Sequence, residues 1–222
     1  MTDLNPKYIT FDCYGTLTRF RMGELAQKFW GDKISPDRMP ALVADFSAYR
    51  FDEVLGAWKP YRDVLHNATR RTAEKWGLTY REEDGETVYQ AVPTWGPHDD
   101  VPAGLSRLAS KYKLVILSNA SNEHIQRNVD KLGAPFHAVF TAEQAQSYKP
   151  RFQGFEYMLK QLGCGPDDLL HVSASLRYDL ISCWGLGIKN KVYVNRGYEP
   201  STPYYGYHEV SDIGGLATLL GV

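Results

Sequence analysis

The sequence predicts an α/β fold: a doubly wound parallel sheet with a helical insertion after its first strand. Two observations carry this prediction. Short apolar runs of strand type alternate with stretches of helical spacing, which is the pattern of parallel strands joined by crossover helices. About seventy residues behind the first run show several helical stretches and no clear strand. The chain has 222 residues, enough to bury a sizeable core and to carry such an insertion.

The first predicted strand opens the segment YITFDCYGTL, from Tyr8 to Leu17. Its β-branched and aromatic residues indicate a buried strand, and Gly15 marks the turn that follows. The aromatic-rich segment from Tyr198 to Tyr207 is predicted to be a surface loop. Four further apolar runs are predicted strands: Lys113–Leu117, Ala138–Thr141, Leu169–Val172 and Lys191–Val194.

Apolar and aromatic residues at three- and four-residue spacings predict helices in the insertion and between the later strands. In the insertion these helices are Gly23–Trp30, Met39–Leu55, Tyr61–Trp76 and Glu82–Ala91. In the remainder they are Pro102–Lys111, Asn122–Leu132, Phe152–Leu162 and Tyr178–Leu186. We therefore expect residues 1–19 and 94–222 to form a Rossmann-like core domain and residues 20–93 to form a separate helical domain.

Composition and charge exclude several classes of protein. The net charge of -1 and the isoelectric point near 6.6 give no basic footprint for nucleic acid. The three cysteines are odd in number and lack a CxxC pair, so no disulfide framework or structural zinc site is expected. No signal peptide and no membrane-spanning run is recognisable. These features predict a cytoplasmic protein without membrane or nucleic-acid partners.

Polar residues follow the predicted strands at the points where the strands end. Asp12 follows the first strand, Ser118 and Asn119 follow the second, and Lys149 comes after the third. The polar segment 173–179 follows the fourth. Because parallel strands present their carboxyl ends at one edge of the sheet, these four segments are expected to converge on one crevice.

Asp12 is the central candidate in this set. Its carboxylate stands where the backbone turns at Gly15, with the Thr16 hydroxyl nearby, so it is well placed to act as a nucleophile. Alternatively, Asp12 merely ends a strand and Lys149 is an exposed turn lysine before Pro150. The ordered convergence of all four segments favours the catalytic interpretation.

The motifs together resemble the haloacid dehalogenase superfamily, over a span from Tyr8 to about Asn195. The four matching motifs are FDCYGTL with Asp12, LSN with Ser118, YKP with Lys149 and HVSASLRYD with Asp179. The resemblance implies that Asp12 is the nucleophile and that the helical insertion is a cap domain.

Departures from the superfamily's phosphatases argue against Mg²⁺. The resemblance implies an acidic residue two positions after the nucleophile, and this chain has Tyr14 there. Where the fourth motif commonly reads GD, the chain has Ser173 and Ala174. A hard dication needs several oxygen ligands, so no metal and no other cofactor is expected.

The form of the motifs resembles the L-2-haloacid dehalogenase branch (haloacid dehalogenase type II), which works without metal. That resemblance implies a pairing of Lys149 with Asp12, and it implies that Thr16 and Ser118 hold a substrate carboxylate. It also gives Asn119 as a halide-side amide and Tyr14 as a pocket wall. The group that orients the lysine and the water is implied to be Ser173, Ser175 and Asp179.

Some expected residues have no clear counterpart in this chain. The branch's halide-binding arginine is missing from the early cap, where Arg50 lies nearest and Arg19 and Arg21 are alternatives. Phe155 stands where the branch has a tyrosine. The fourth motif carries one more residue before its aspartate and has Ser175 in place of asparagine. Trp58 is a candidate pocket residue. The six histidines, His171 included, show no metal-ligand spacing and are predicted to be structural.

These observations predict a metal-independent hydrolase that opens the carbon–halogen bond of a short 2-haloalkanoate through an aspartyl ester and yields a 2-hydroxy acid. Alternatives are displacement of another group from C2, such as fluoride of fluoroacetate or the ring nitrogen of a strained cyclic 2-carboxylate, a Mg²⁺-dependent phosphatase, and a non-catalytic binding protein. The expected partner is a small 2-halocarboxylate substrate. The resemblance also implies a homodimer.

Overall fold

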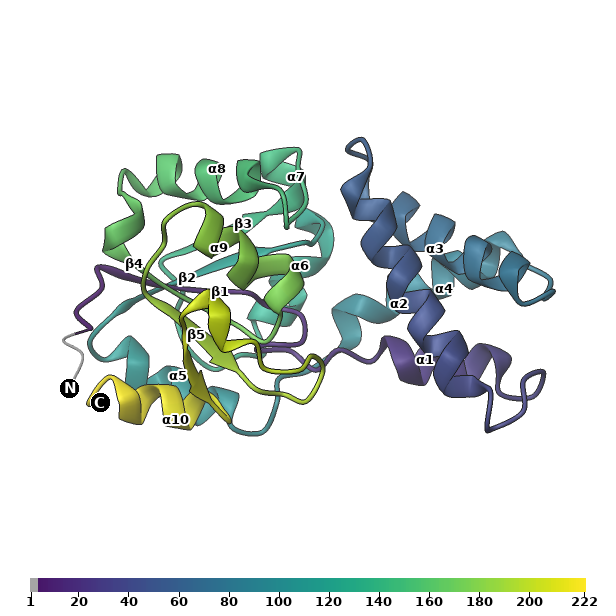
Figure 1. The fold of residues 1–222 in the computed structure, drawn as a ribbon, viewed down its shortest axis with the longest axis horizontal. Coiled ribbons are helices and arrows are strands. Elements are labelled where there is room, and N and C mark those ends of the chain that lie inside the picture. The colour runs from purple at the N-terminus through teal and green to yellow at the C-terminus, as the bar shows by residue number, and fades with distance from the viewer. Residues whose placement is uncertain (1–3) are drawn as a thin grey trace. The chain divides into compact units, whose positions relative to one another are not determined.

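The computed structural model describes residues 4–222 of the chain. These divide into two compact units, one made of Met1–Arg19 and Gly96–Val222 and the other of Phe20–Trp95. We call the first the sheet unit and the second the helical unit, and Figure 1 labels the elements of both.

The sheet unit is built on six parallel strands in the order β3-β2-β1-β4-β5-β6. This order confirms the predicted doubly wound α/β fold. The five predicted strands are all present, and β6 is an additional edge strand. The strands are β1 (Tyr8–Phe11), β2 (Lys113–Ser118), β3 (Ala138–Thr141), β4 (Leu169–Ser173), β5 (Lys191–Val194) and β6 (His208–Val210).

Both faces of the sheet are covered by helices because alternate strand residues point to opposite sides. Ile9 and Phe11 belong to the apolar core that includes α5 and α10. Tyr8 belongs to a second core, to which α8 contributes Phe155 and α9 contributes Cys183. Figure 1 shows α8 and α9 on one side of the strands and α5 with α10 on the other. The helices of this unit are α5 (Val101–Ala109), α6 (Asn122–Val129), α7 (Ala142–Ala145), α8 (Phe152–Leu162), α9 (Ile181–Gly185) and α10 (Ile213–Leu219).

Three shorter helical turns complete the sheet unit. The 3₁₀ turns are η2 (Pro166–Asp168) and η4 (Pro203–Tyr205), and η3 (Leu176–Leu180) is a π-helical turn. The helix predicted from Tyr178 to Leu186 is therefore divided between η3 and α9.

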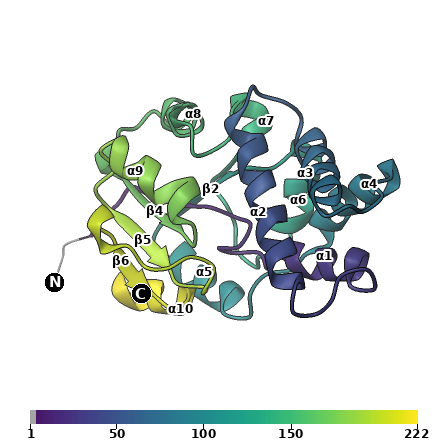
Figure 2. The same ribbon diagram turned by 45° about the vertical axis from the view of Figure 1, so that its right-hand side comes forward.

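The helical unit contains the four helices predicted for the insertion, and Figure 2 shows them from a second side. Its core forms where apolar faces meet, for example where Trp30 of the first helix packs edge-on against Phe46 of the second at 5.9 Å between ring centroids. Within residues 4–222 no helix is both long and apolar enough to cross a membrane. The elements are α1 (Met22–Trp30), α2 (Met39–Leu55), α3 (Tyr61–Lys75), α4 (Glu82–Ala91) and the 3₁₀ turn η1 (Val92–Thr94).

The strand order creates a switch point at β1. From β1 the chain moves through β2 to β3 at one edge, while β4, β5 and β6 extend on the other side of β1. Open α/β sheets bind ligands beyond the carboxyl ends of the strands at such a point. Asp12 directly follows β1, and Ser118 and Ser173 are the last residues of the two neighbouring strands.

Candidate active site

The loop after β1 holds the Asp12 carboxylate from both sides. The Asp12 N–H donates to the carbonyl of Val172 in β4 at 3.0 Å, which continues the strand pairing into the loop. The chain then turns at Gly15, whose φ of 95° is a conformation that favours glycine. This turn brings the Thr16 hydroxyl back to donate to Asp12 Oδ2 at 2.7 Å. The Thr16 hydroxyl in turn accepts from the N–H of Ala174 at 2.9 Å.

Lys149 lies between the two carboxylates of the site. Its ammonium donates to Asp12 Oδ1 at 2.9 Å, to Asp179 Oδ1 at 2.7 Å and to the carbonyl of Leu117 at 3.0 Å. An ammonium has three hydrogens, so these acceptors use its full capacity. Because the side chain is only 2% exposed, the lysine is a fixed positive charge and not a surface turn residue.

Asp179 is completely buried and accepts from three side chains. Besides Lys149, these are His171 Nε2 at 3.0 Å from Oδ1 and the Ser173 hydroxyl at 3.1 Å from Oδ2. The other ring nitrogen of His171, Nδ1, lies 2.8 Å from the hydroxyl of Thr10 in β1. This network fixes Asp179, and through it the position of the lysine ammonium.

The three ionisable groups at the centre shift one another's pKa values. Burial is the largest influence on Asp12 and raises its pKa above the ordinary 3.8, against the opposing charge of Lys149. Burial acts on Asp179 in the same direction, but the charge of Lys149 and the hydrogen bond from His171 prevail and lower its pKa. Burial would lower the pKa of Lys149, but the charges of Asp12 and Asp179 outweigh it and raise that pKa above 10.5. The site therefore keeps its ammonium and an ionised Asp179.

Ser118 and Asn119 lie beside this network with different commitments. The Asn119 amide accepts from the N–H of Lys149 at 2.8 Å and donates to the carbonyl of the same residue at 2.9 Å. Asn119 therefore holds the lysine segment, and only the second hydrogen of its amide nitrogen is available for another acceptor. The Ser118 hydroxyl is buried and makes no hydrogen bond to the residues that the structure describes.

Tyr14 and Ser175, both predicted to face the substrate, have protein partners. The Tyr14 hydroxyl donates to Oδ1 of Asn128 in α6 at 3.1 Å. The Ser175 hydroxyl donates its one hydrogen to Glu199 Oε1 at 2.9 Å and accepts from the N–H of Tyr178. In this arrangement the hydroxyl of Ser175 serves the protein and has no hydrogen left for a substrate.

Arg50 and Trp58, the other two predicted substrate-binding residues, belong to the helical unit. Arg50 lies in α2, and its guanidinium lies over the rings of Phe20 and Phe46, at 5.0 Å and 4.6 Å from their centroids. Trp58 lies in the loop between α2 and α3. Their roles toward a substrate stay predictions.

Two functional features escaped prediction from the sequence. His171 was expected to be structural, but it donates to the carboxylate that holds Lys149. A usable signal was the strand register, because residues two apart in a strand share a face and Ser173 was already a candidate. The second feature is Arg196, which donates to the carbonyl of Thr16 at 3.1 Å and forms two hydrogen bonds with Asp100. Arg196 thus fixes the loop that positions the Thr16 hydroxyl.

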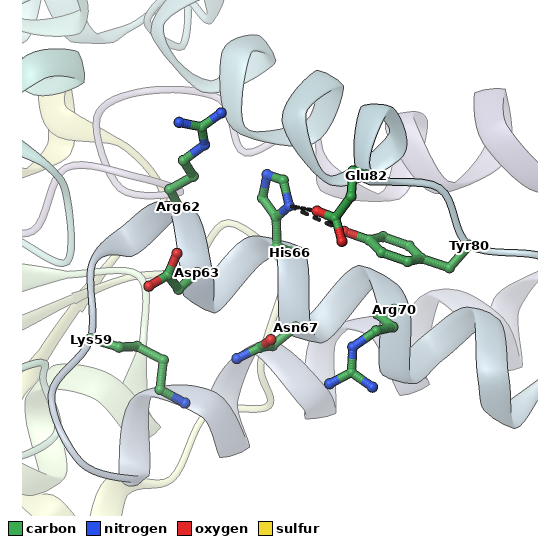
Figure 3. A pocket seen from close by; sticks show the side chains of 8 residues that line it. All are labelled: Lys59, Arg62, Asp63, His66, Asn67, Arg70, Tyr80 and Glu82. Atoms are coloured by element: carbon green, nitrogen blue, oxygen red, sulfur yellow. Dashed lines mark hydrogen bonds and ion pairs between the residues drawn. The ribbon is translucent and has the colours of Figure 1, made fainter.

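A separate pocket of about 640 Å³ opens in the helical unit, between α3 and the segment that leads into α4 (Figure 3). Its charged side chains are paired: His66 Nδ1 lies 3.0 Å from Glu82, and Arg62 lies 2.6 Å from Glu86. The pocket therefore presents balanced charge, and none of the predicted site residues lines it. The lining residues are Lys59, Arg62, Asp63, His66, Asn67, Arg70, Tyr80 and Glu82. Among the residues that the structure describes, no cluster of three or more histidine, cysteine or acidic side chains is arranged to hold a metal ion.

Comparison with known proteins gives the same family at three levels. The family model described as haloacid dehalogenase-like hydrolase matches residues 6–183. The (S)-2-haloacid dehalogenase H-109 of Pseudomonas putida is 24% identical over 226 residues, which is 92% of this chain and 96% of that protein.

Solved structures share the fold. One is L-2-haloacid dehalogenase from Xanthobacter autotrophicus with chloropropionic acid covalently bound, at 20% identity and a TM-score of 0.79, covering 97% of this chain and 98% of the other. Another is the putative HAD-hydrolase YfnB from Bacillus subtilis bound to magnesium, at 16% identity and a TM-score of 0.80, covering 99% and 100%. At these identities the structural likeness shows the fold alone.

The doubly wound sheet, with an aspartate held by a lysine at its switch point, places the chain among the α/β hydrolytic enzymes. The chain belongs to the haloacid dehalogenase-like hydrolases, whose family model spans most of its length.

Proposed function

We propose that the chain is a metal-independent dehalogenase that hydrolyses short 2-haloalkanoic acids. One observation carries the proposal: the ammonium of Lys149 contacts both Asp12 and Asp179. A fixed protein cation thus balances the nucleophile, which is the electrostatic task that a bound dication performs in metal-dependent relatives. Tyr14 and Ala174 stand at the two positions where further acidic groups are expected for a metal, and neither side chain offers a carboxylate.

The first chemical step is displacement at C2 of the substrate. A carboxylate oxygen of Asp12 forms a bond to C2 while the carbon–halogen bond breaks, and the halide leaves with the bonding electrons. The product is an ester on Asp12 with an inverted carbon. This step needs an ionised nucleophile in a mostly dry site, and Asp12, only 7% exposed beside a protonated lysine, meets both conditions.

The second step hydrolyses the ester. Water attacks the carbonyl carbon of the Asp12 ester, the 2-hydroxy acid leaves, and the carboxylate returns. The net products are the 2-hydroxy acid, halide and one proton. Lys149 stabilises negative charge that develops on the Asp12 oxygen, and Asp179 with Ser173 keeps the lysine in place. Neutral donors for the substrate carboxylate are the Thr16 hydroxyl and the unused Ser118 hydroxyl.

Features outside the sheet unit's network complete the proposal. The helical unit acts as a cap, in which Arg50 supplies a cation toward the halide or the substrate carboxylate and Trp58 supplies an apolar wall. The amide of Asn119 gives its second hydrogen to the halide. A cytoplasmic location and a homodimer stay part of the same proposal, supported by the resemblance to L-2-haloacid dehalogenases.

The test is halide release from fluoroacetate, chloroacetate and both enantiomers of 2-chloropropionate, in the presence of EDTA. We expect release that EDTA leaves unchanged and that the Asp12→Asn variant abolishes. Activity that EDTA removes and Mg²⁺ restores would refute metal independence and favour a phosphatase.

A second leaving group is favoured by one observation. The Ser175 hydroxyl faces Glu199, so this site lacks one donor that was expected to face the substrate. If no chloride is released but fluoroacetate is turned over, or a strained cyclic 2-carboxylate is opened, the same aspartyl-ester chemistry acts on that substrate class.

A further inference from the structure

The segment between Ser173 and Asp179 contains a π-helical turn. In η3 the N–H of Leu180 donates to the carbonyl of Ser175 at 3.3 Å, a bond that spans five residues. Such a turn holds one residue more than an α-helical turn and is found mostly at functional sites. It accommodates the additional residue of the fourth motif and still places Asp179 against Lys149.

The start of this turn is held by Glu199, a residue from the distant segment behind β5. Its Oε2 accepts from the N–H groups of Leu176 at 2.8 Å and Arg177 at 3.2 Å. Its Oε1 accepts from the hydroxyl of Ser175 at 2.9 Å. The first N–H groups of a helical turn have no partner within the turn, so one carboxylate satisfies both of them and the preceding serine.

Glu199 is itself fixed. Its side chain is only 18% exposed, and its carbonyl accepts from the hydroxyl of Tyr193 at 2.6 Å. Tyr193 is fully buried in β5, which makes the sheet the anchor of this contact. Glu199 also lies outside residues 6–183, the part of the chain that the family model matches.

We propose that Glu199 is a positioning residue of the active site. It sets the π-helical turn, and the turn carries Asp179 to the 2.7 Å contact with Lys149. Because that contact holds the lysine on Asp12, a carboxylate from the C-terminal segment controls the geometry of the nucleophile. The effect on turnover rests on the proposed function, whereas the effect on the Asp179–Lys149 contact does not.

The test uses Glu199→Ala and Glu199→Gln in the full chain. Displacing a catalytic group by about 1 Å costs on the order of a hundredfold in rate, so we expect Glu199→Ala to lower kcat per folded molecule by about ten- to a hundredfold with little change in KM. Gln keeps the shape and an acceptor for the two N–H groups, and we expect it to restore kcat to within about threefold. Glu209→Ala is the matched control, because Glu209 is a carboxylate of the same segment that contacts Asn195 and Ser201 and should leave kcat unchanged.

A double-mutant cycle separates positioning from direct substrate contact. If Ser175 acts through Glu199, Ser175→Ala and Glu199→Ala together lower kcat no further than Glu199→Ala alone. Crystal structures of the variants give a readout without substrate: the distance from Asp179 to Lys149 should lengthen beyond hydrogen-bond range in Glu199→Ala. An unchanged distance, or wild-type kcat in Glu199→Ala, overturns the proposal. A wild-type enzyme that releases no halide refutes the proposed substrate, and the distance measurement still decides the role of Glu199.

Discussion

Replacing Lys149 by Met removes the only cation of the buried cluster and keeps most of its volume. In the wild type, one ammonium faces the carboxylates of Asp12 and Asp179. In Lys149→Met both carboxylates keep their other donors, Thr16 for the first and His171 with Ser173 for the second, but no positive charge remains in contact. We expect halide release to be lost and the fold to be strongly destabilised.

The magnitude follows from burial. Removing one partner of a buried ion pair costs about 3–5 kcal/mol, because the remaining charge is left uncompensated. For a chain of 222 residues, each kcal/mol lowers Tm by about 2–4 °C. The expected decrease in Tm is therefore about 6–20 °C. Asp179→Asn in the Lys149→Met background removes one of the two opposed carboxylates and should restore more than about 1 kcal/mol.

The assay is urea unfolding of the wild type, Lys149→Met and the double variant. The pH dependence supplies a second criterion. Without the lysine, burial and mutual repulsion raise the pKa of both carboxyl groups, so the folded state binds more protons than the unfolded state and stability should rise as pH falls. A Lys149→Met variant within about 1 kcal/mol of the wild type, or a double variant less stable than the single one, would refute the ion-pair reasoning.

Three further predictions concern the same network. Asp12→Asn should abolish halide release without lowering the free energy of unfolding measured in urea, because the raised pKa of Asp12 means that the fold disfavours its ionised form at neutral pH; a clearly less stable variant would contradict this. The acid limb of kcat/KM should have an apparent pKa above 3.8, since protonated Asp12 cannot attack, and an initial-rate profile that stays flat down to that pH would contradict the burial argument. His171→Phe should lower stability by about 1–3 kcal/mol and reduce kcat, because Asp179 loses a buried donor; His171→Gln, which retains a donor, should recover part of both in urea unfolding and halide-release assays, and equal losses in the two variants would assign His171 to packing alone.

The fold was predictable where apolar periodicity is strong. The runs at Tyr8 and Lys113 are buried on both faces, so they are apolar throughout and identify themselves as parallel strands. The strand β6 has only three residues and lies at the sheet edge, which leaves too little pattern to detect. Two glycines in α10 weaken its helical signal, and the helix forms because Ile213 and Leu216 are buried against the sheet.

The candidate site was predictable only as far as strand ends reveal it. Asp12, Lys149, Ser173 and Asp179 converge because parallel strands and their loops share one edge. The role of Glu199 depends on contacts with residues more than twenty positions away and on a π-helical turn, and neither has a local sequence signature. For the same reason the hydroxyl of Ser175 was assigned to the substrate, although it donates to the protein.

One lysine serves two carboxylates, and the difference between them assigns their roles. Asp179 accepts from Lys149, His171 and Ser173 and is completely buried, so it is stabilised as a permanent anion and its oxygens are occupied. Asp12 accepts from Lys149 and Thr16, and its side chain keeps 10% exposure. Fewer donors leave Asp12 the higher pKa and the more basic oxygens, and a nucleophile needs both an available lone pair and access to its substrate. The same ammonium therefore stabilises one carboxylate as a support and leaves the other able to react.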